Sequence, residues 1–248
     1  MTILTKIFVT LILLSSLILT PFSAQAATIS DQELETKVLD IIRNNPEVII
    51  ESLQSFQAQR QQEVEEKRQA VLSEMKGNPT AFIRNSPTTG SAQKDIVLFE
   101  FSDFQCPFCA QAHNTLKTFM SKHGDRVTLV FKHLPLSRAH PEALPAAFSA
   151  YAAQQQGKFW EYHNALFENQ DRLGEDLYQE IARNLGLDLD RFERDRTSVS
   201  ARRALQEDLQ LAEALMIQGT PFLVMNGEVI PGAVELEEFE QVLEKVSQ

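Results

Sequence analysis

The sequence is poor in cysteine, with only two, Cys106 and Cys109, among 248 residues. A secreted protein of this size can carry several structural disulfides, so a scaffold held together by many bridges is excluded. Only two residues separate the cysteines, and a bridge across so short a loop would remove little conformational entropy from the unfolded chain. The pair is therefore better explained by chemical reactivity than by stability.

The chain also lacks the excess of positive charge that nucleic-acid binding requires. Its formal net charge is −11, which leaves little prospect of a basic face that neutralises phosphates. The same negative net charge argues against binding to an anionic lipid surface. Hydrophobic residues make up 43% of the chain and charged residues 23%, which is typical of a globular protein with one or two domains.

Beyond its N-terminus the sequence has no apolar run that is long enough to cross a membrane. At the N-terminus, Lys6 precedes an apolar or small stretch, Ile7–Leu19, and the sequence AQA at positions 24–26 has the form of a cleavage site. The stretch is shorter than the ~20 residues that span a bilayer. We expect residues 1–26 to be a signal peptide, with a retained membrane anchor as the alternative. The mature chain would then be periplasmic or otherwise extracytoplasmic.

Residues 27–79 are predicted to form an N-terminal helical extension. Ser30 and Glu33 have the spacing of a capping box, and Asn45-Pro46 predicts a break before a second helix. The almost wholly polar stretch at 57–69 is typical of a solvated helix or a partner-binding arm. The extension either leans on its own domain or forms an oligomerisation stalk.

Residues 80–248 are predicted to form an α/β domain. A turn-rich linker with one short edge strand occupies 80–95, and two apolar strands then flank a helix, which predicts parallel pairing. Near the end, Asn226-Gly227 predicts a hairpin turn. The predicted elements are strands at 96–101, 126–131, 221–225 and 228–230, helices at 106–122 and 235–246, and an all-helical insertion over about 138–200.

The position of the cysteines favours redox chemistry. Cys106 lies where a strand ends and a helix begins, and there unpaired N–H groups and the helix dipole stabilise a thiolate. Cys109 lies about one turn further on the same face and can resolve a mixed disulfide made by Cys106. Pro107 suits a first helical turn because it lacks an N–H. We expect Phe108 to be exposed and to form part of an apolar docking patch.

Metal binding is the main alternative for the same residues. Cys106, Cys109 and His113 have the spacing C-x2-C-x3-H, but a closed zinc site normally takes four ligands and no second paired motif is present. We expect His113 to lie on the helix surface and expect neither a metal nor an organic cofactor, since electrons would pass through the dithiol. Copper(I) sequestration by the reduced pair remains an alternative.

Glu100 interrupts an otherwise apolar strand six residues before Cys106. Strand alternation places Phe99 and Phe101 on one face and Glu100 on the other. A carboxyl buried there would have a raised pKa and could take or relay the proton of Cys109. The alternative is that Glu100 reaches solvent at a strand edge.

Four segments of the sequence resemble the DsbA-like branch of the thioredoxin superfamily. They are IVLFEFSDFQCPFC at 96–109, VFKHLPL at 130–136 with HPEA at 140–143, QGKFWEYHNALFENQ at 156–170 and GTPFLVMNG at 219–227. The resemblance covers about residues 94–246 and implies a thioredoxin fold, βαβ then ββα, interrupted by the helical insertion. It also implies that the protein is a thiol-disulfide oxidoreductase.

The resemblance assigns roles to individual residues. Cys106 would attack, Cys109 would resolve, and Thr220-Pro221 would carry a cis peptide bond that shapes the substrate groove. Glu100 matches the buried acid of the family. Strong oxidants of the family have histidine where this chain has Phe108, so the resemblance does not extend to a very oxidising potential.

The N-terminal extension resembles those of DsbA-like proteins of the suppressor-of-copper-sensitivity type, in which it can drive oligomerisation and isomerase activity. The sequence therefore predicts an exported oxidase or isomerase. Its partners would be unfolded or misoxidised secreted proteins, a membrane redox partner that resets the cysteines, and further copies of the chain. A copper-binding protein and a surface-displayed interaction protein with a vestigial site remain the alternatives.

Overall fold

The computed structural model describes residues 30–248. The predicted signal peptide, residues 1–26, and its alternative as a membrane anchor lie outside the described residues. The chain divides into two compact units between Ala58 and Gln59. In the part that the structure describes, no helix has the length and apolar character needed to cross a membrane.

The first unit consists of helix α2, Asp31–Asn44, and the beginning of helix α3, Pro46–Gly77. Ser30 caps α2 by accepting the Glu33 N–H at 3.3 Å, and the chain breaks at Asn45 before Pro46 begins α3, as predicted. None of the residues of α2 is buried. The two buried residues of α3, Leu72 and Met75, belong to the second unit.

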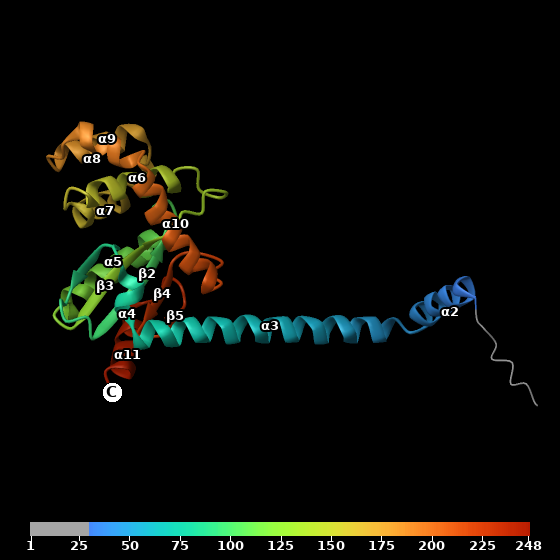
Figure 1. Cartoon of the computed structure of the whole chain (residues 1–248). Helices are drawn as coiled ribbons and strands as arrows, with labels where there is room; N and C mark the ends of the chain where they lie inside the picture. The colour runs from blue at the N-terminus through green and yellow to red at the C-terminus, as the bar shows by residue number, and fades with distance from the viewer. Residues whose placement is uncertain (1–29) are drawn as a thin grey trace, which may run out of the picture. The chain divides into compact units, whose positions relative to one another are not determined.

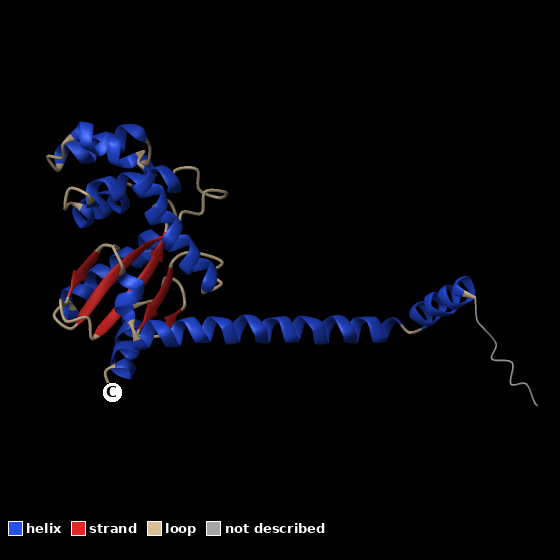
Figure 2. Ribbon diagram, in the orientation of Figure 1, coloured by secondary structure: helices blue, strands red, loops and turns tan. Residues whose placement is uncertain are grey.

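The second unit is built on a five-stranded sheet (Figures 1 and 2). The strand order is β1-β3-β2-β4-β5, in which β2 and β3 are parallel and the other neighbours are antiparallel. Helix α5, Pro107–His123, connects the parallel pair. The strands are β1 (Thr88–Gly90), β2 (Ile96–Ser102), β3 (Val127–His133), β4 (Phe222–Met225) and β5 (Glu228–Ile230). This is the predicted thioredoxin-type arrangement, βαβ followed by ββα.

The two faces of the sheet carry different side chains, as strand alternation requires. Phe99 and Phe101 pack with Leu72 and Met75 of α3 and with the end of helix α10, Val199–Ala214. The opposite face packs against α5 and against helix α11, Leu236–Val246. Every residue of β2 is buried, because β2 lies at the centre of the sheet and is covered on both faces.

The loops around the sheet show one difference from the prediction. The stretch expected to be a linker with an edge strand does contain β1, but it begins with a short helix, α4, Pro79–Ile83. Pro79 is the first residue of α4, where its missing N–H costs no hydrogen bond. At the other end, Asn226 and Gly227 both have positive φ, 45° and 85°, which is typical of the tight hairpin turn predicted there.

The insertion between β3 and β4 is entirely helical (Figure 2). Alanines of α6 allow close approach of its neighbours, and large aromatic residues of α7, α8 and α9 fill the core around them. Helix α10 leads back from the insertion to the sheet (Figure 1). The helices are α6 (Ala143–Gln154), α7 (Phe159–Glu168), a 3₁₀ turn (Gln170–Arg172), α8 (Glu175–Asn184) and α9 (Leu189–Arg196).

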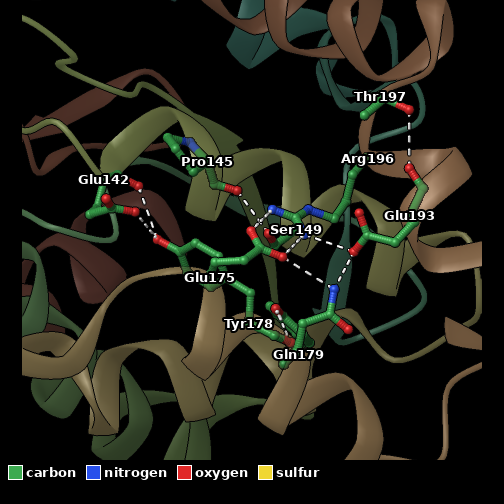
Figure 3. Close-up of polar contacts among 10 residues, drawn as sticks. Glu142, Pro145, Ser149, Glu175, Tyr178, Gln179, Glu193, Arg196 and Thr197 are labelled. Carbon is green, nitrogen blue, oxygen red and sulfur yellow. Dashed lines mark hydrogen bonds and ion pairs between the residues drawn. The ribbon is translucent and has the colours of Figure 1, made fainter.

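Arg196 forms the polar junction of this insertion (Figure 3). Its guanidinium donates two hydrogen bonds to the carboxylate of Glu175, each 2.7 Å long, and a third to Glu193 at 2.8 Å. The same group lies 5.7 Å from the centre of the Tyr178 ring and 5.4 Å from that of Phe192. One cation thus connects α8 to α9 while its side chain stays only 11% exposed.

We predict that Arg196→Met destabilises the protein by about 1–2 kcal/mol, since paired and stacked arginines contribute amounts of this order when their partners are partly exposed. Urea unfolding measures the change. Arg194→Met, on the exposed side of the same helix, is the matched control and should leave the unfolding midpoint almost unchanged. Equal midpoints for the two variants would contradict the role of Arg196.

Candidate active site

Cys106 and Cys109 lie at the start of α5, directly after the central strand β2 (the strand and helix are labelled in Figure 1). Cys106 is the N-cap residue and has an extended backbone, and Pro107 is the first helical residue. The Cys106 carbonyl accepts the N–H groups of Cys109 at 3.0 Å and Ala110 at 3.2 Å. The N–H groups of Phe108 and Cys109, in the first turn of the helix, lie close enough to the Cys106 sulfur to favour its thiolate.

These surroundings stabilise the thiolate of Cys106. A hydrogen bond from the Cys109 thiol is the largest of the effects that together lower the pKa of Cys106 to about 5, and burial opposes them. The Thr220 hydroxyl and backbone N–H groups of the first turn of α5 add to the lowering. In the protonated form, the Cys106 thiol lies 3.3 Å from the Thr220 carbonyl and donates to it.

Cys109 has the opposite character. Its side chain is 0% exposed, and burial, followed by its hydrogen bond to Cys106, raises its pKa far above the ordinary value. The Asp103 N–H donates to its sulfur at 3.5 Å. The two sulfurs are unbonded in this structure, and the charge of the reduced pair is held by Cys106.

The residues around the cysteine pair differ widely in their exposure to solvent. Phe108 is 62% exposed, as predicted for an apolar docking residue, and Pro107 beside it is also exposed. Cys106 is only 4% exposed, which is little for an attacking nucleophile. It lies against Phe104 and the insertion, which narrow the approach to its sulfur. The contrast with the fully enclosed Cys109 still leaves Cys106 as the sulfur nearer to solvent.

The structure brings the Thr220-Pro221 dipeptide to the cysteines from 114 residues away in the chain. Its peptide bond is cis, as the resemblance implied, and Pro221 is buried while Thr220 is half-buried. The predicted residues Cys106, Cys109, Thr220 and Pro221 therefore lie together at one end of the sheet.

Glu100 lies below this group, inside the sheet. It is 1% exposed because β2 is the central strand, so the alternative that placed it at a solvent-facing edge is wrong. Burial raises the pKa of its carboxyl to about 7, and the Ser102 hydroxyl opposes that effect. A group with this pKa can give or take a proton near neutral pH.

Asp103 is a residue of the site that the sequence did not single out. Its carboxylate is 1% exposed and accepts hydrogen bonds from the N–H of Gln105 at 2.8 Å and of Leu136 at 2.9 Å. It also pairs with Nδ1 of His140 at 2.8 Å. Asp103 thus ties the cysteine loop to the loop that follows β3. The sequence offered two signs of this contact, an acid just before the cysteines and the histidine of the HPEA segment.

Gln170 makes a second connection that the sequence did not reveal. Its amide nitrogen donates to the carbonyls of Phe104 and Cys106, both at 2.9 Å. The helical insertion therefore holds the backbone of the cysteine loop directly. Spacing alone cannot indicate such a bond, because it joins residues 64 and 66 positions apart.

His113 corrects one expectation. It is buried, with 7% exposure, rather than lying on the helix surface, because α7 and the turn after it cover this side of α5. Its ring stacks on Phe167 at 5.0 Å and meets the edge of His163 at 5.1 Å. Among residues 30–248 no three His, Cys, Asp or Glu side chains are arranged to hold a metal ion.

The model of the DSBA-like thioredoxin domain family matches residues 96–244, more than half of the chain. The chain belongs to this family. The matched segment contains both cysteines, Glu100 and the Thr220-Pro221 dipeptide, and it includes the whole helical insertion. Its fold is accordingly that of thiol-disulfide exchange proteins, with the helical N-terminal region added.

Solved structures agree with this assignment. A thioredoxin-like oxidoreductase from Silicibacter pomeroyi DSS-3 is 29% identical, covers 66% of this chain and 93% of its own, and superposes with a TM-score of 0.62. ScsC from Proteus mirabilis, in a transitional conformation, is 21% identical and covers 90% of this chain and 97% of its own, with a TM-score of 0.60. The second likeness, at this identity, concerns the fold, including a helical N-terminal region.

One curated relative carries a similar segment as part of a much longer protein. The Na(+)/H(+) antiporter NhaA 1 of Mycolicibacterium vanbaalenii is 38% identical over 141 residues, which are 56% of this chain and 23% of that relative. The chain thus spans about a quarter of the length of the curated relatives it matches. Most of that antiporter has no counterpart in the match, so the antiporter name carries no activity over to this chain.

We predict that the reduced protein is alkylated at Cys106 with a rate that rises as pH increases through about 5, because the thiolate forms in that range. Iodoacetamide labelling followed by mass spectrometry, or the ultraviolet absorbance of the thiolate, measures the midpoint. Cys109 should stay unlabelled throughout, since burial keeps it protonated.

Two variants control this titration. Cys109→Ala should move the midpoint upward, because it removes the largest cause of the low pKa of Cys106. Cys106→Ala should abolish labelling near neutral pH. A wild-type midpoint of about 8.5, the pKa of an unperturbed cysteine, would show that the site does not stabilise the thiolate.

Proposed function

We propose that the protein is an exported thiol-disulfide oxidoreductase that forms or isomerises disulfide bonds in other secreted proteins. The observation that carries the proposal is the unequal pair, in which Cys106 has its pKa lowered to about 5 while that of Cys109 is raised. Such a pair divides the roles of attacking and resolving thiol between its members. No organic cofactor is needed, because the electrons reside in the two sulfurs.

In the oxidising direction, a client thiolate attacks Cys106 of the oxidised pair. The bond between Cys106 and Cys109 breaks, and Cys109 leaves with the electron pair and takes up a proton. A second client thiolate then attacks the client sulfur of the mixed disulfide. Cys106 leaves as a thiolate, and its low pKa makes it a good leaving group. The client gains a disulfide and the protein is left as a dithiol.

In isomerisation the reduced pair acts first. The Cys106 thiolate attacks a wrong disulfide of the client, and one client sulfur leaves as a thiolate. A different thiolate of the client then attacks the client sulfur that is joined to Cys106, forms the correct disulfide and displaces the Cys106 thiolate. When this exchange stalls, Cys109 attacks Cys106 and releases the client in its reduced form.

The residues around the pair suit an unfolded client. Phe108 and Pro107 offer an exposed apolar surface next to Cys106. Thr220 is half-buried beside the same sulfur and can pair with an extended segment of client backbone. Because each oxidation leaves a dithiol, a membrane redox partner is needed to reset the pair. The predicted signal peptide supports a periplasmic or other extracytoplasmic location for both partners.

The direction of catalysis follows from two assays, one with a reduced test protein and one with a test protein whose disulfides are scrambled. We predict that Cys106→Ser abolishes activity in both, because the attacking sulfur is lost. Cys109→Ser should accumulate a mixed disulfide with the client, detected by non-reducing electrophoresis, because the resolving sulfur is lost. Turnover by Cys106→Ser in either assay would contradict the proposed function.

We also propose that the N-terminal helices join copies of the chain. Ten large apolar side chains of the first unit are between 41% and 63% exposed, which is far more than a monomer of this kind normally leaves uncovered. They follow helical spacing along α2 and the start of α3, so that identical helices can bury them against each other. They are Leu34, Val38, Leu39, Ile41, Ile42, Val48, Ile49, Ile50, Leu53 and Phe56.

We predict that replacing Ile42, Leu53 and Phe56 together by lysine converts the full chain to a monomer, measured by light scattering. The matched control places the same three charges at the exposed polar positions Gln54, Gln57 and Gln61 and should leave the assembly intact. If isomerase activity depends on assembly, the first variant loses it and keeps its oxidase activity. A wild-type chain that is monomeric at all concentrations would refute the proposed assembly.

A further inference from the structure

A cavity of about 720 Å³ lies where the end of β3 meets helices α6 and α10 of the insertion (these elements are labelled in Figure 1). The loop between α4 and β1 forms its remaining wall. Neither cysteine lines it, nor does the Thr220-Pro221 dipeptide. Small-molecule sites typically measure about 300–1,000 Å³ and often lie where structural units meet. The size and position of this cavity therefore suit a small ligand.

The inner wall of the cavity carries a buried ion pair. Lys132 of β3 and Asp208 of α10 have side chains that are only 3% and 8% exposed, and Nζ of Lys132 donates to Oδ1 of Asp208 at 3.0 Å. The other carboxylate oxygen of Asp208 accepts the His133 N–H at 2.9 Å. An ammonium group has three N–H donors. Within residues 30–248 the ammonium of Lys132 makes this one hydrogen bond, so two donors of a buried cation lack an acceptor.

His133 is a second buried residue of the lining with an unused polar atom. It is 3% exposed, and its Nε2 has no hydrogen-bond partner among the described residues. Burial lowers the pKa of His133 to about 3, so the ring is neutral near pH 7. A neutral imidazole can carry its N–H on either nitrogen, so Nε2 can donate to a ligand. Because unpaired buried polar atoms are uncommon, Lys132 and His133 together indicate an acceptor that the described chain does not supply.

Two arginines line the more exposed part of the same cavity. Arg84 lies in the loop after α4 and Arg203 lies in α10, and both side chains are mostly exposed. Each contacts the carboxylate of Glu207, at 3.5 Å from Arg84 and 3.1 Å from Arg203. The contact of Arg203 uses its Nε, and neither of its terminal nitrogens makes a hydrogen bond within residues 30–248. The guanidinium groups therefore keep donors for a ligand.

The charge balance of the lining favours an anion. Three cationic side chains and two carboxylates leave one net positive charge around the cavity, in a chain whose formal net charge is −11. Both carboxylates are already in contact with cations of the lining. The unused donors come from β3, from α10 and from the loop after α4. Negatively charged oxygens would give these donors charge-assisted hydrogen bonds, which are the stronger kind.

We propose that this cavity is a binding site for a small polyanion that bears carboxylate or phosphate groups. Lys132 and His133 hold one anionic group at the inner end, and Arg84 and Arg203 hold a second group nearer to solvent. The site is separate from the redox pair and does not depend on the proposed disulfide exchange. Because its residues come from both the sheet and the insertion, the bound anion would also hold these two parts together.

Isothermal titration calorimetry of the full chain with sodium citrate and, separately, with sodium phosphate tests the site. We expect saturable binding of at least one probe with one site per chain, and the probe that binds more tightly shows whether carboxylate or phosphate is preferred. Sodium chloride at matched ionic strength is the blank, because it reproduces the screening of charges without the anionic groups. If neither probe shows saturable binding, the proposal is overturned.

Two neighbouring arginines of α10 provide a matched comparison. Arg203→Gln should weaken binding of the better probe about 10-fold, because a charge-assisted hydrogen bond typically contributes a factor of this order. Arg202→Gln removes the same charge at the next position, which is exposed and does not line the cavity, and it should bind like the wild type. Equal affinities of the two variants would place the anion elsewhere and would overturn the assignment.

The inner end is tested by replacing the buried ion pair as a unit. Lys132→Met alone would leave Asp208 as an unpaired buried charge and destabilise the fold, so it is combined with Asp208→Leu. The double variant should lose saturable binding, and its urea unfolding without ligand shows whether it is folded. Wild-type affinity in the folded double variant would refute the role of Lys132. If the double variant is unfolded, the comparison of Arg203→Gln with Arg202→Gln still decides the proposal.

Discussion

The redox pair depends on a difference in environment between its two cysteines, which lowers the pKa of Cys106 and raises that of Cys109. Cys106 lies at the N-cap of α5, where N–H groups favour a negative charge, and Cys109 lies one turn inside, where burial disfavours it. A helix beginning directly after a buried central strand produces both environments at once. The Thr220 side chain helps to lower the pKa of Cys106. At Cys109, burial outweighs the Asp103 N–H, which donates to the sulfur and by itself lowers the pKa.

Much of the fold followed from the sequence. Apolar runs of strand length, the Asn226-Gly227 turn and the cysteines at a strand-helix boundary predicted the order βαβ, helical insertion, ββα. Helix α4 was missed because its five residues are too few to show a helical period. The burial of His113 was missed for a different reason. It depends on α7 packing over α5, which is a tertiary contact that local spacing cannot report.

The candidate site was predicted in part. The cysteines and the Thr220-Pro221 dipeptide were identified, the first from their spacing and the second through the family resemblance. The burial of Glu100 was left undecided, because alternation assigns a side chain to a face without saying what covers that face. Asp103 and Gln170 were not identified. Their importance depends on which atoms lie within hydrogen-bond distance after the chain folds, and ordinary polar residues in a loop or strand give no sign of it.

Gln170 connects the helical insertion to the cysteine loop, although it lies 66 and 64 positions from the two residues that it contacts. One amide nitrogen satisfies two carbonyls of the cysteine loop, at Phe104 and Cys106. The insertion therefore supports the backbone of the cysteine loop. Without the insertion, the Phe104 carbonyl would lose this donor, whereas the Cys106 carbonyl would keep the N–H groups of Cys109 and Ala110. Variation in this protein should thus be freer on the outer surface of the insertion than at the turn that carries this glutamine.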